Sequence, residues 1–161
     1  MFGFAKRVSA ERAGRSLAQK ALDPGACLKQ ANRLPGRPDH DPIACCEIAF
    51  AKAGTLKHVI ADTQGAALAG RMNAAVDAAV EETFAGAHTA ETRAHYGSED
   101  LREIAARAVA QYQVDGFWAD RVAQTLGRRL RQAGRPSAEA ARIFTDLTQE
   151  TVLALFKLRL V

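Results

Sequence analysis

Proline is absent from a run of 93 consecutive residues between Pro42 and Pro136, and alanine recurs through this run at helical spacing. Proline breaks helices and alanine has the highest intrinsic helix propensity, so such a run favours helices over strands. The chain contains 34 alanines among 161 residues and few of the β-branched or aromatic runs that are typical of strands. The sequence therefore predicts an all-α protein.

Length and composition indicate a single domain. A chain of 161 residues is a common size for one domain with one hydrophobic core. No window approaches the roughly 18 to 20 consecutive apolar residues of a membrane span. The three cysteines are an odd number and two of them are adjacent, so we expect reduced thiols in a cytoplasmic protein. Arginine outnumbers lysine 16 to 6, which together with the alanine content indicates a bacterial genome rich in GC.

Charge is distributed unevenly along the chain. Residues 1–37 contain eight Lys/Arg and two Asp/Glu, residues 38–114 contain six and eleven, and residues 115–161 contain eight and five. A basic–acidic–basic order lets the two ends fold back over the middle or bind an acidic partner. The alternative is a solvated surface with no functional meaning.

Turn-forming residues divide the chain into about six helices. A basic N-terminal helix is expected over residues 4–22, and a short helix near 26–33 precedes a connection rich in proline and glycine. Asp41 followed by Pro42 is a strong start signal for the next helix. Because long consecutive helices with short turns pack antiparallel, residues 42–161 are expected to form the core bundle of a domain that covers the whole chain, 1–161.

The bundle should contain a buried helix followed by a long one. The helix that starts at Pro42 is apolar on nearly all sides, as expected of a central element, and Gly54 is expected to end it. Apolar residues then recur at steps of four, which predicts one long central helix near residues 56–84. Glycines and polar residues in the segment 85–98 leave helix and loop both open there.

A possible metal site lies within that segment. On a continuous helix His88, Glu91 and His95 would occupy positions i, i+3 and i+7 and share one face. Two imidazoles and a carboxylate can bind zinc or non-haem iron. The alternative interpretation is a polar, exposed connection that binds no metal, and the absence of a paired Glu-x-x-His motif favours it.

A second candidate ligand-binding group is Cys45, Cys46 and Glu47 in the apolar helix. A buried carboxylate needs a partner, and His58 and Asp62 of the next helical stretch are within reach of Glu47. The alternatives are that Glu47 reaches solvent or pairs with an arginine in the core. Neither Cys-x-x-Cys nor Cys-x-x-Cys-His spacing is present, so the cysteines are more typical of core packing than of a metal or haem site.

A third hypothesis is nucleic-acid binding through the basic helix that spans Arg121 to Arg135. Arg128, Arg131 and Arg135 would share a face at i, i+3 and i+7 and follow a phosphate backbone. The modest net charge of +4 and the low aromatic content argue against it. Nor does the chain contain a nucleophile elbow, a Walker loop or a dinucleotide fingerprint, which weakens an enzymatic function without removing it.

The function that the sequence favours is helix-mediated protein–protein interaction, with a homodimer expected. The last ten residues are apolar on more than one face, and exposed apolar area is typical of partner contact. The N-terminus combines aromatic residues with cations, so it is expected to dock on a partner or on its own domain. The expected contact residues are Phe2, Phe4, Leu155, Phe156 and Leu158, with Arg128, Arg131 and Arg135 as an electrostatic guide.

Overall fold

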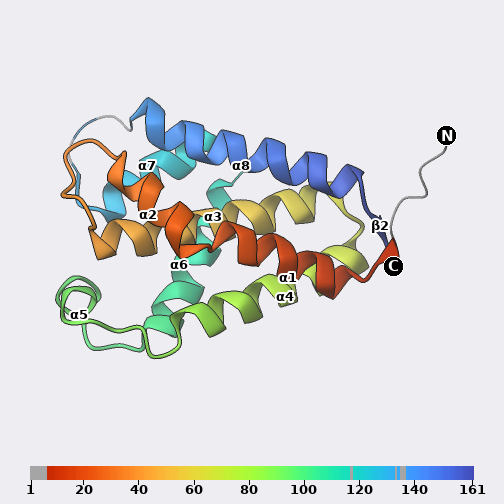
Figure 1. The fold of residues 1–161 in the computed structure, drawn as a ribbon, viewed down its shortest axis with the longest axis horizontal. Helices are drawn as coiled ribbons and strands as arrows, with labels where there is room; N and C mark the ends of the chain where they lie inside the picture. The colour runs from red at the N-terminus through yellow and green to blue at the C-terminus, as the bar shows by residue number, and fades with distance from the viewer. Residues whose placement is uncertain (1–6, 117, 133, 135–136) are drawn as a thin grey trace.

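The computed structural model describes residues 7–116, 118–132, 134 and 137–161, and these residues form eight helices and two strands of two residues each (Figure 1). The prediction of an all-α, single-domain fold is confirmed. In chain order the elements are β1 (Arg7–Val8), α1 (Ala10–Ala21), α2 (Pro24–Asn32), α3 (Pro42–Thr63), α4 (Ala66–Phe84), α5 (Ala90–Tyr96), α6 (Leu101–Asp115), α7 (Ala119–Arg129), α8 (Ala138–Phe156) and β2 (Arg159–Leu160).

Polar N-cap side chains explain where most of these helices begin. At six of them a side-chain oxygen of the N-cap accepts a hydrogen bond from a backbone N–H in the first turn, which satisfies a donor that the helix itself cannot. The predicted start at Asp41 is one of these: its carboxylate accepts from the N–H of Ile43, with Pro42 in the first helical position.

The prediction of one long helix near residues 56–84 is wrong. α3 continues through Gly54 to Thr63, and the chain is extended at Gln64 and Gly65 before α4 begins. Glycine costs about 1 kcal/mol in a helix interior relative to alanine, so Gly65 is the weak point of the apolar row. Gly54 remains helical because its place in α3 is fixed by packing, as described below.

Two other boundaries also differ from expectation. The first helix begins at Ala10, because Ser9 caps it and the residues before it form β1; residues 4–6 of the predicted helix lie outside the described residues. The segment 85–98 is part loop and part helix. Its helix, α5, is only seven residues long and starts after Thr89, whose side chain forms a capping box with Thr92.

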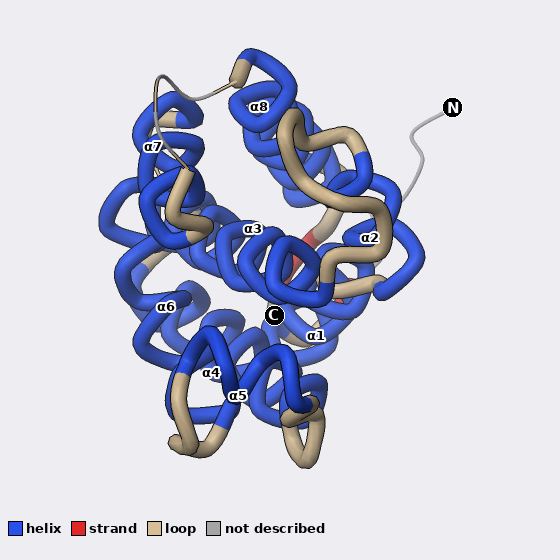
Figure 2. The backbone as a smooth tube through the Cα atoms, turned by 90° about the vertical axis from the view of Figure 1, so that its left-hand side faces the viewer, coloured by secondary structure: helices blue, strands red, loops and turns tan. Residues whose placement is uncertain are grey.

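α3 is the central element of the fold. It contacts each of the other seven helices of the described chain, and Figure 2 shows it surrounded by them. Most of its residues from Ile43 to Ile60 are buried, which agrees with its apolar sequence on all sides. No helix in the described ranges combines the length and the apolar character that a membrane span requires.

Glycines allow two close helix–helix contacts. A Cβ atom at Gly54 would lie 2.5 Å from Cβ of Tyr112 and 2.8 Å from the carbonyl oxygen of Val109, so the absence of a side chain lets α3 and α6 approach. Gly14 of α1 likewise lies directly against the backbone of Met72 in α4. The helix pairs α3–α6 and α1–α4 are therefore fixed by backbone proximity as well as by side-chain packing.

The two ends of the described chain are joined. β1 and β2 pair in parallel, with Arg7 opposite Arg159 and Val8 opposite Leu160. The N–H of Val161 donates to the carbonyl of Val8 at 3.1 Å, and the N–H of Ala10 donates to the carbonyl of Val161 at 3.2 Å. This short ladder places the C-terminal end of α8 beside the start of α1 (Figure 1).

The close contact at Gly54 gives a direct test of the core. Gly54→Ala should lower the free energy of unfolding by about 2 to 3 kcal/mol, because the added methyl group has to displace the α6 backbone. Gly70→Ala is the matched control: it lies in α4 with nothing within 4 Å of the added Cβ, and it should raise the free energy of unfolding by about 0.5 to 1 kcal/mol. Urea denaturation followed by circular dichroism measures both. Equal midpoints for the two variants would contradict the packing described here.

Candidate functional site

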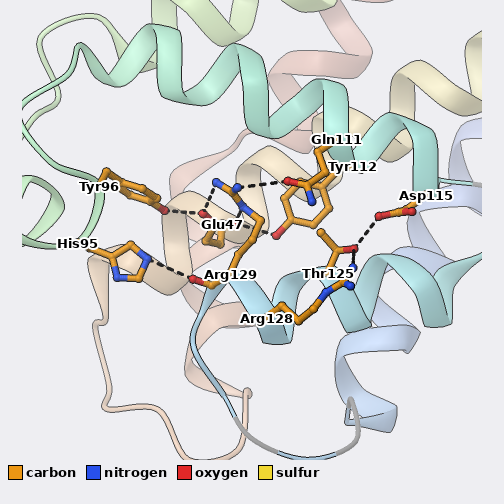
Figure 3. A network of polar contacts seen from close by, with 9 residues as sticks. All are labelled: Glu47, His95, Tyr96, Gln111, Tyr112, Asp115, Thr125, Arg128 and Arg129. Atoms are coloured by element: carbon orange, nitrogen blue, oxygen red, sulfur yellow. Dashed lines mark hydrogen bonds and ion pairs between the residues drawn. The ribbon is translucent and has the colours of Figure 1, made fainter.

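The main polar cluster of the interior is centred on Glu47 in α3. Its side chain is completely buried, and both carboxylate oxygens are satisfied (Figure 3). Oε1 accepts from the hydroxyl of Tyr96 at 2.7 Å and from Nη2 of Arg129 at 3.0 Å. Oε2 accepts from the hydroxyl of Tyr112 at 2.7 Å and from Nε of Arg129 at 2.7 Å. The cluster thus contains a bidentate ion pair and two neutral donors around one carboxylate.

Four helices contribute to this cluster. Glu47 comes from α3, Tyr96 from α5, Tyr112 from α6 and Arg129 from the end of α7. The guanidinium of Arg129 also lies 5.8 Å from the ring centroid of Tyr112 and donates to the side-chain oxygen of Gln111 at 3.4 Å. Because a buried carboxylate is costly unless its oxygens are bonded, each of these helices is held in place by the same group.

The electrostatics of the cluster keep both phenols protonated. Burial raises the pKa of Tyr112 and of Tyr96 well above the ordinary range, and the neighbouring charge of Glu47 raises both further. Burial alone would lower the pKa of Arg129, but its hydrogen bonds and its charge interaction with Glu47 outweigh that, and the net pKa is raised. The groups are fully satisfied by one another, so the arrangement supports structure and offers no open position for a substrate.

The predicted partners of Glu47 were only partly correct. The interpretation that it pairs with a core arginine is confirmed by Arg129. His58 and Asp62 are not among its hydrogen-bond partners. The sequence pattern singled out neither Arg129 nor the two tyrosines as partners of Glu47, although Tyr96 and Tyr112 are the only tyrosines of the chain.

The three residues of the predicted metal site do not converge in this structure. His88 precedes the N-cap of α5 and its Nδ1 lies 2.8 Å from Oγ1 of Thr92, whereas Nε2 of His95 lies 3.2 Å from the carbonyl oxygen of Arg129. Glu91 is exposed in the first turn. The helical face that would align them does not exist, because α5 begins only after Thr89. Among the described residues no group of three or more His, Cys, Asp or Glu side chains could hold a metal ion.

The three cysteines are free thiols, and Cys46 lies next to Glu47 in the chain. Burial raises the pKa of Cys46 to about 12, with the adjacent carboxylate of Glu47 adding to the effect. Burial also raises the pKa of Cys27 and of Cys45. Protonated thiols are poor metal ligands and poor nucleophiles, so these residues are typical of core packing.

The predicted arginine face is not continuous. α7 ends at Arg129 with Leu130 as its C-cap, so Arg128 and Arg131 do not continue on one helix, and Arg135 lies outside the described residues. The side chain of Arg128 donates to the hydroxyl of Thr125 at 3.0 Å, and that of Arg131 donates to the carbonyl oxygen of His95 at 3.3 Å. Both guanidinium groups therefore have partners within the chain, as does Arg129.

The predicted apolar contact residues separate into three groups. Phe2 and Phe4 lie outside the described residues. Leu155 is buried in the core, and Leu158 is half-buried against it, so neither presents a full side chain to a partner. Phe156 is 84% exposed at the end of α8. The sequence did not single out Leu153, which is 59% exposed one turn before it.

In comparisons with protein-family models, curated proteins and solved structures, nothing matches this chain. The class of protein is therefore defined by the fold and the cluster alone: an all-α domain whose central helix carries a fully paired, buried carboxylate.

The buried cluster can be tested by mutation. Glu47→Gln should lower the free energy of unfolding by about 3 kcal/mol, because it leaves the guanidinium of Arg129 without a counter-charge. Tyr112→Phe should lower the free energy of unfolding by about 1 to 2 kcal/mol, since one carboxylate oxygen loses one neutral hydrogen-bond donor. The control is Glu82→Gln, which removes the exposed ion pair with Arg15 and should cost less than about 1 kcal/mol. Chemical denaturation compares the three; similar losses for Glu47→Gln and Glu82→Gln would contradict the structure.

The same cluster predicts a specific alkaline transition. In the folded protein the pKa of each tyrosine is raised above its unfolded value of about 10. The contribution of the cluster to the free energy of unfolding is therefore fully present below about pH 10 and declines as the pH rises above that value. Because Tyr96 and Tyr112 are the only tyrosines, the increase in absorbance at 295 nm that accompanies phenol ionisation comes from them alone. Tyrosinate should appear only together with loss of helical circular dichroism. Ionisation near pH 10 with the helices intact would show that the phenols are not enclosed.

Proposed function

We propose that the protein is a helix-mediated interaction domain that associates with a second copy of itself through the outer face of α8. The observation that carries the proposal is the exposure of two large apolar side chains one turn apart, Leu153 at 59% and Phe156 at 84%. Both residues belong to the last turn of α8, and this end of the helix lies beside the joined chain ends (Figure 1). Adjacent exposed apolar residues of this size are typical of contact surfaces.

The charges of α8 support an antiparallel contact between two copies. Lys157 follows the apolar pair and is exposed, and Asp146 is exposed about three turns earlier on the same helix. In an isologous contact each surface meets its own copy, so antiparallel helices bring the end of one α8 toward the middle of the other. Lys157 of each copy would then lie near Asp146 of the other, with Leu153 and Phe156 between them.

Neither alternative function from the sequence has comparable support in the described residues. The candidate metal ligands His88, Glu91 and His95 are apart, and the thiols beside Glu47 are protonated. The arginines proposed for nucleic acid have intrachain partners where they are described. Metal and nucleic-acid binding stay hypotheses of the sequence.

Self-association can be measured with one substitution. The wild-type protein should approach twice its monomer mass as concentration rises, and Phe156→Asp should remain a monomer, because a buried charge would replace an apolar contact. Its free energy of unfolding should stay within about 0.5 kcal/mol of the wild-type value, since the side chain of Phe156 is exposed. Val114→Asp is the matched control: Val114 is 82% exposed at the end of α6 and should leave the mass unchanged. Sedimentation equilibrium measures all three.

A charge swap tests the orientation of the contact. Lys157→Glu should weaken the dimer, and adding Asp146→Lys in the same chain should restore it, because the pair then has opposite charges in the reversed order. A wild-type protein that stays monomeric at every concentration would refute self-association. A dimer that survives Phe156→Asp would refute the role of α8.

A further inference from the structure

A groove runs between α8 on one side and α1 and α2 on the other. Its volume is about 1050 Å³, slightly above the usual range of about 300 to 1,000 Å³ for a small-molecule site. Its lining residues come mainly from α1, α2 and α8. The lining is mixed: apolar side chains include Leu17, Ile143 and Leu147, and charged side chains of both signs surround them.

Lys52 of α3 lines this groove although its side chain is almost fully buried, with 4% exposure. Nζ donates to Oε1 of Gln30 at 3.1 Å and lies 4.0 Å from Sγ of Cys27. Burial raises the pKa of that thiol, so Cys27 does not supply a counter-charge. No carboxylate within the described residues forms an ion pair with Lys52. Burying an ammonium without a counter-ion is energetically unfavourable, and a lysine in this state is unusual in folded proteins.

Lys52 lines the groove together with Gln30, the side chain that accepts a hydrogen bond from its ammonium. The titratable groups around the ammonium of Lys52 come from three neighbouring elements. They are Cys27 and Asp23 at α2, Glu150 on α8 and Lys20 on α1, and all except the Cys27 thiol line the groove. Burial lowers the pKa of Lys52, and the attraction of Asp23 and Glu150 offsets this only in part. A ligand with a negative group that enters the groove would provide the counter-ion for Lys52.

Gln30 adds a second donor at the same place. Its Oε1 accepts a hydrogen bond from Nζ of Lys52, so the amide N–H groups of its Nε2 remain to donate. Lys52 has three N–H bonds and directs one of them to Gln30. One carboxylate could therefore accept from both side chains, with charge assistance from the ammonium.

The remaining charges of the groove define the ligand further. A polyanion such as a nucleotide triphosphate is disfavoured, because the cations and the carboxylates of the lining are equal in number. An apolar body beside a single carboxylate fits the aliphatic side chains. The charged lining residues are Lys20, Arg33, Lys52 and Arg142 against Asp23, Glu139, Asp146 and Glu150.

We propose that this groove binds a monocarboxylate with an extended apolar body, of the fatty-acid type, and that its carboxylate lies on Lys52 and Gln30. The apolar chain lies along α8 between Ile143, Leu147 and Leu17. This site is separate from the Glu47 cluster, and Asp146 is the one described residue that it shares with the contact proposed for α8.

The probe is decanoate, compared with decan-1-ol and decylamine by calorimetric titration of the full chain. Saturable 1:1 binding of decanoate is expected, with the alcohol and the amine at least about tenfold weaker, because only the carboxylate pairs with Lys52. Lys52→Met should weaken decanoate at least about tenfold, and Lys29→Met, an exposed lysine on α2, should leave it unchanged. Binding of the alcohol as tightly as decanoate, or no saturable binding at millimolar concentration, would overturn the proposal.

A second variant and a second readout keep the test independent of folding. Gln30→Glu places a carboxylate beside Lys52 and should compete with the ligand, so decanoate binding should fall while the lysine is retained. In NMR of protein made with ¹³C-labelled lysine, decanoate should raise the pKa of Lys52, and decan-1-ol should not. Unchanged decanoate affinity in Gln30→Glu, or a Lys52 pKa that does not respond to decanoate, would refute the assignment of the site.

Discussion

The buried carboxylate of Glu47 requires hydrogen-bond partners for both of its oxygens, and the surrounding helices are arranged to provide them. It is completely buried in α3, the helix that contacts all the others described, and a buried carboxylate is stable only when its oxygens are bonded. Tyr96, Tyr112 and Arg129 supply those bonds from three different helices. A shift of α5, α6 or α7 along its axis would leave a charged group unpaired in the interior, so the cluster selects one arrangement of helices that apolar packing alone would not distinguish.

The role of the cluster also explains why α5 and the end of α7 are ordered beside the core. α5 is only seven residues long, and helices of that length are not stable alone in water. Its Tyr96 donates to Glu47, and the carbonyl of its neighbour His95 accepts from Arg131 just past the end of α7. Nε2 of His95 in turn lies 3.2 Å from the carbonyl of Arg129. The two segments are thus held together by polar contacts.

The sequence was sufficient for the fold class and for the central position of α3, because both follow from local propensity and from apolar residues on every side of one helix. It was not sufficient for the helix boundaries. Gly54 and Gly65 have the same intrinsic preference, yet one lies within a helix and the other ends one. The difference arises from Tyr112 and Val109, which approach Gly54 from a helix more than fifty residues later. A single sequence does not show that these residues of α6 lie against Gly54 in space.

The candidate sites show the same limit. A charge within an apolar helix was recognised at Glu47, and the same reasoning applied to Lys52, five residues later, would have marked the second buried charge of α3. What the sequence could not provide is the difference between them. Glu47 has its full set of partners within the chain, and no free bonding position remains. Lys52 has one amide, a neutral thiol and an open groove beside it. A buried charge that the fold satisfies stabilises the structure, whereas one that the fold leaves without a counter-ion at a groove is where a ligand of opposite charge contributes most to binding.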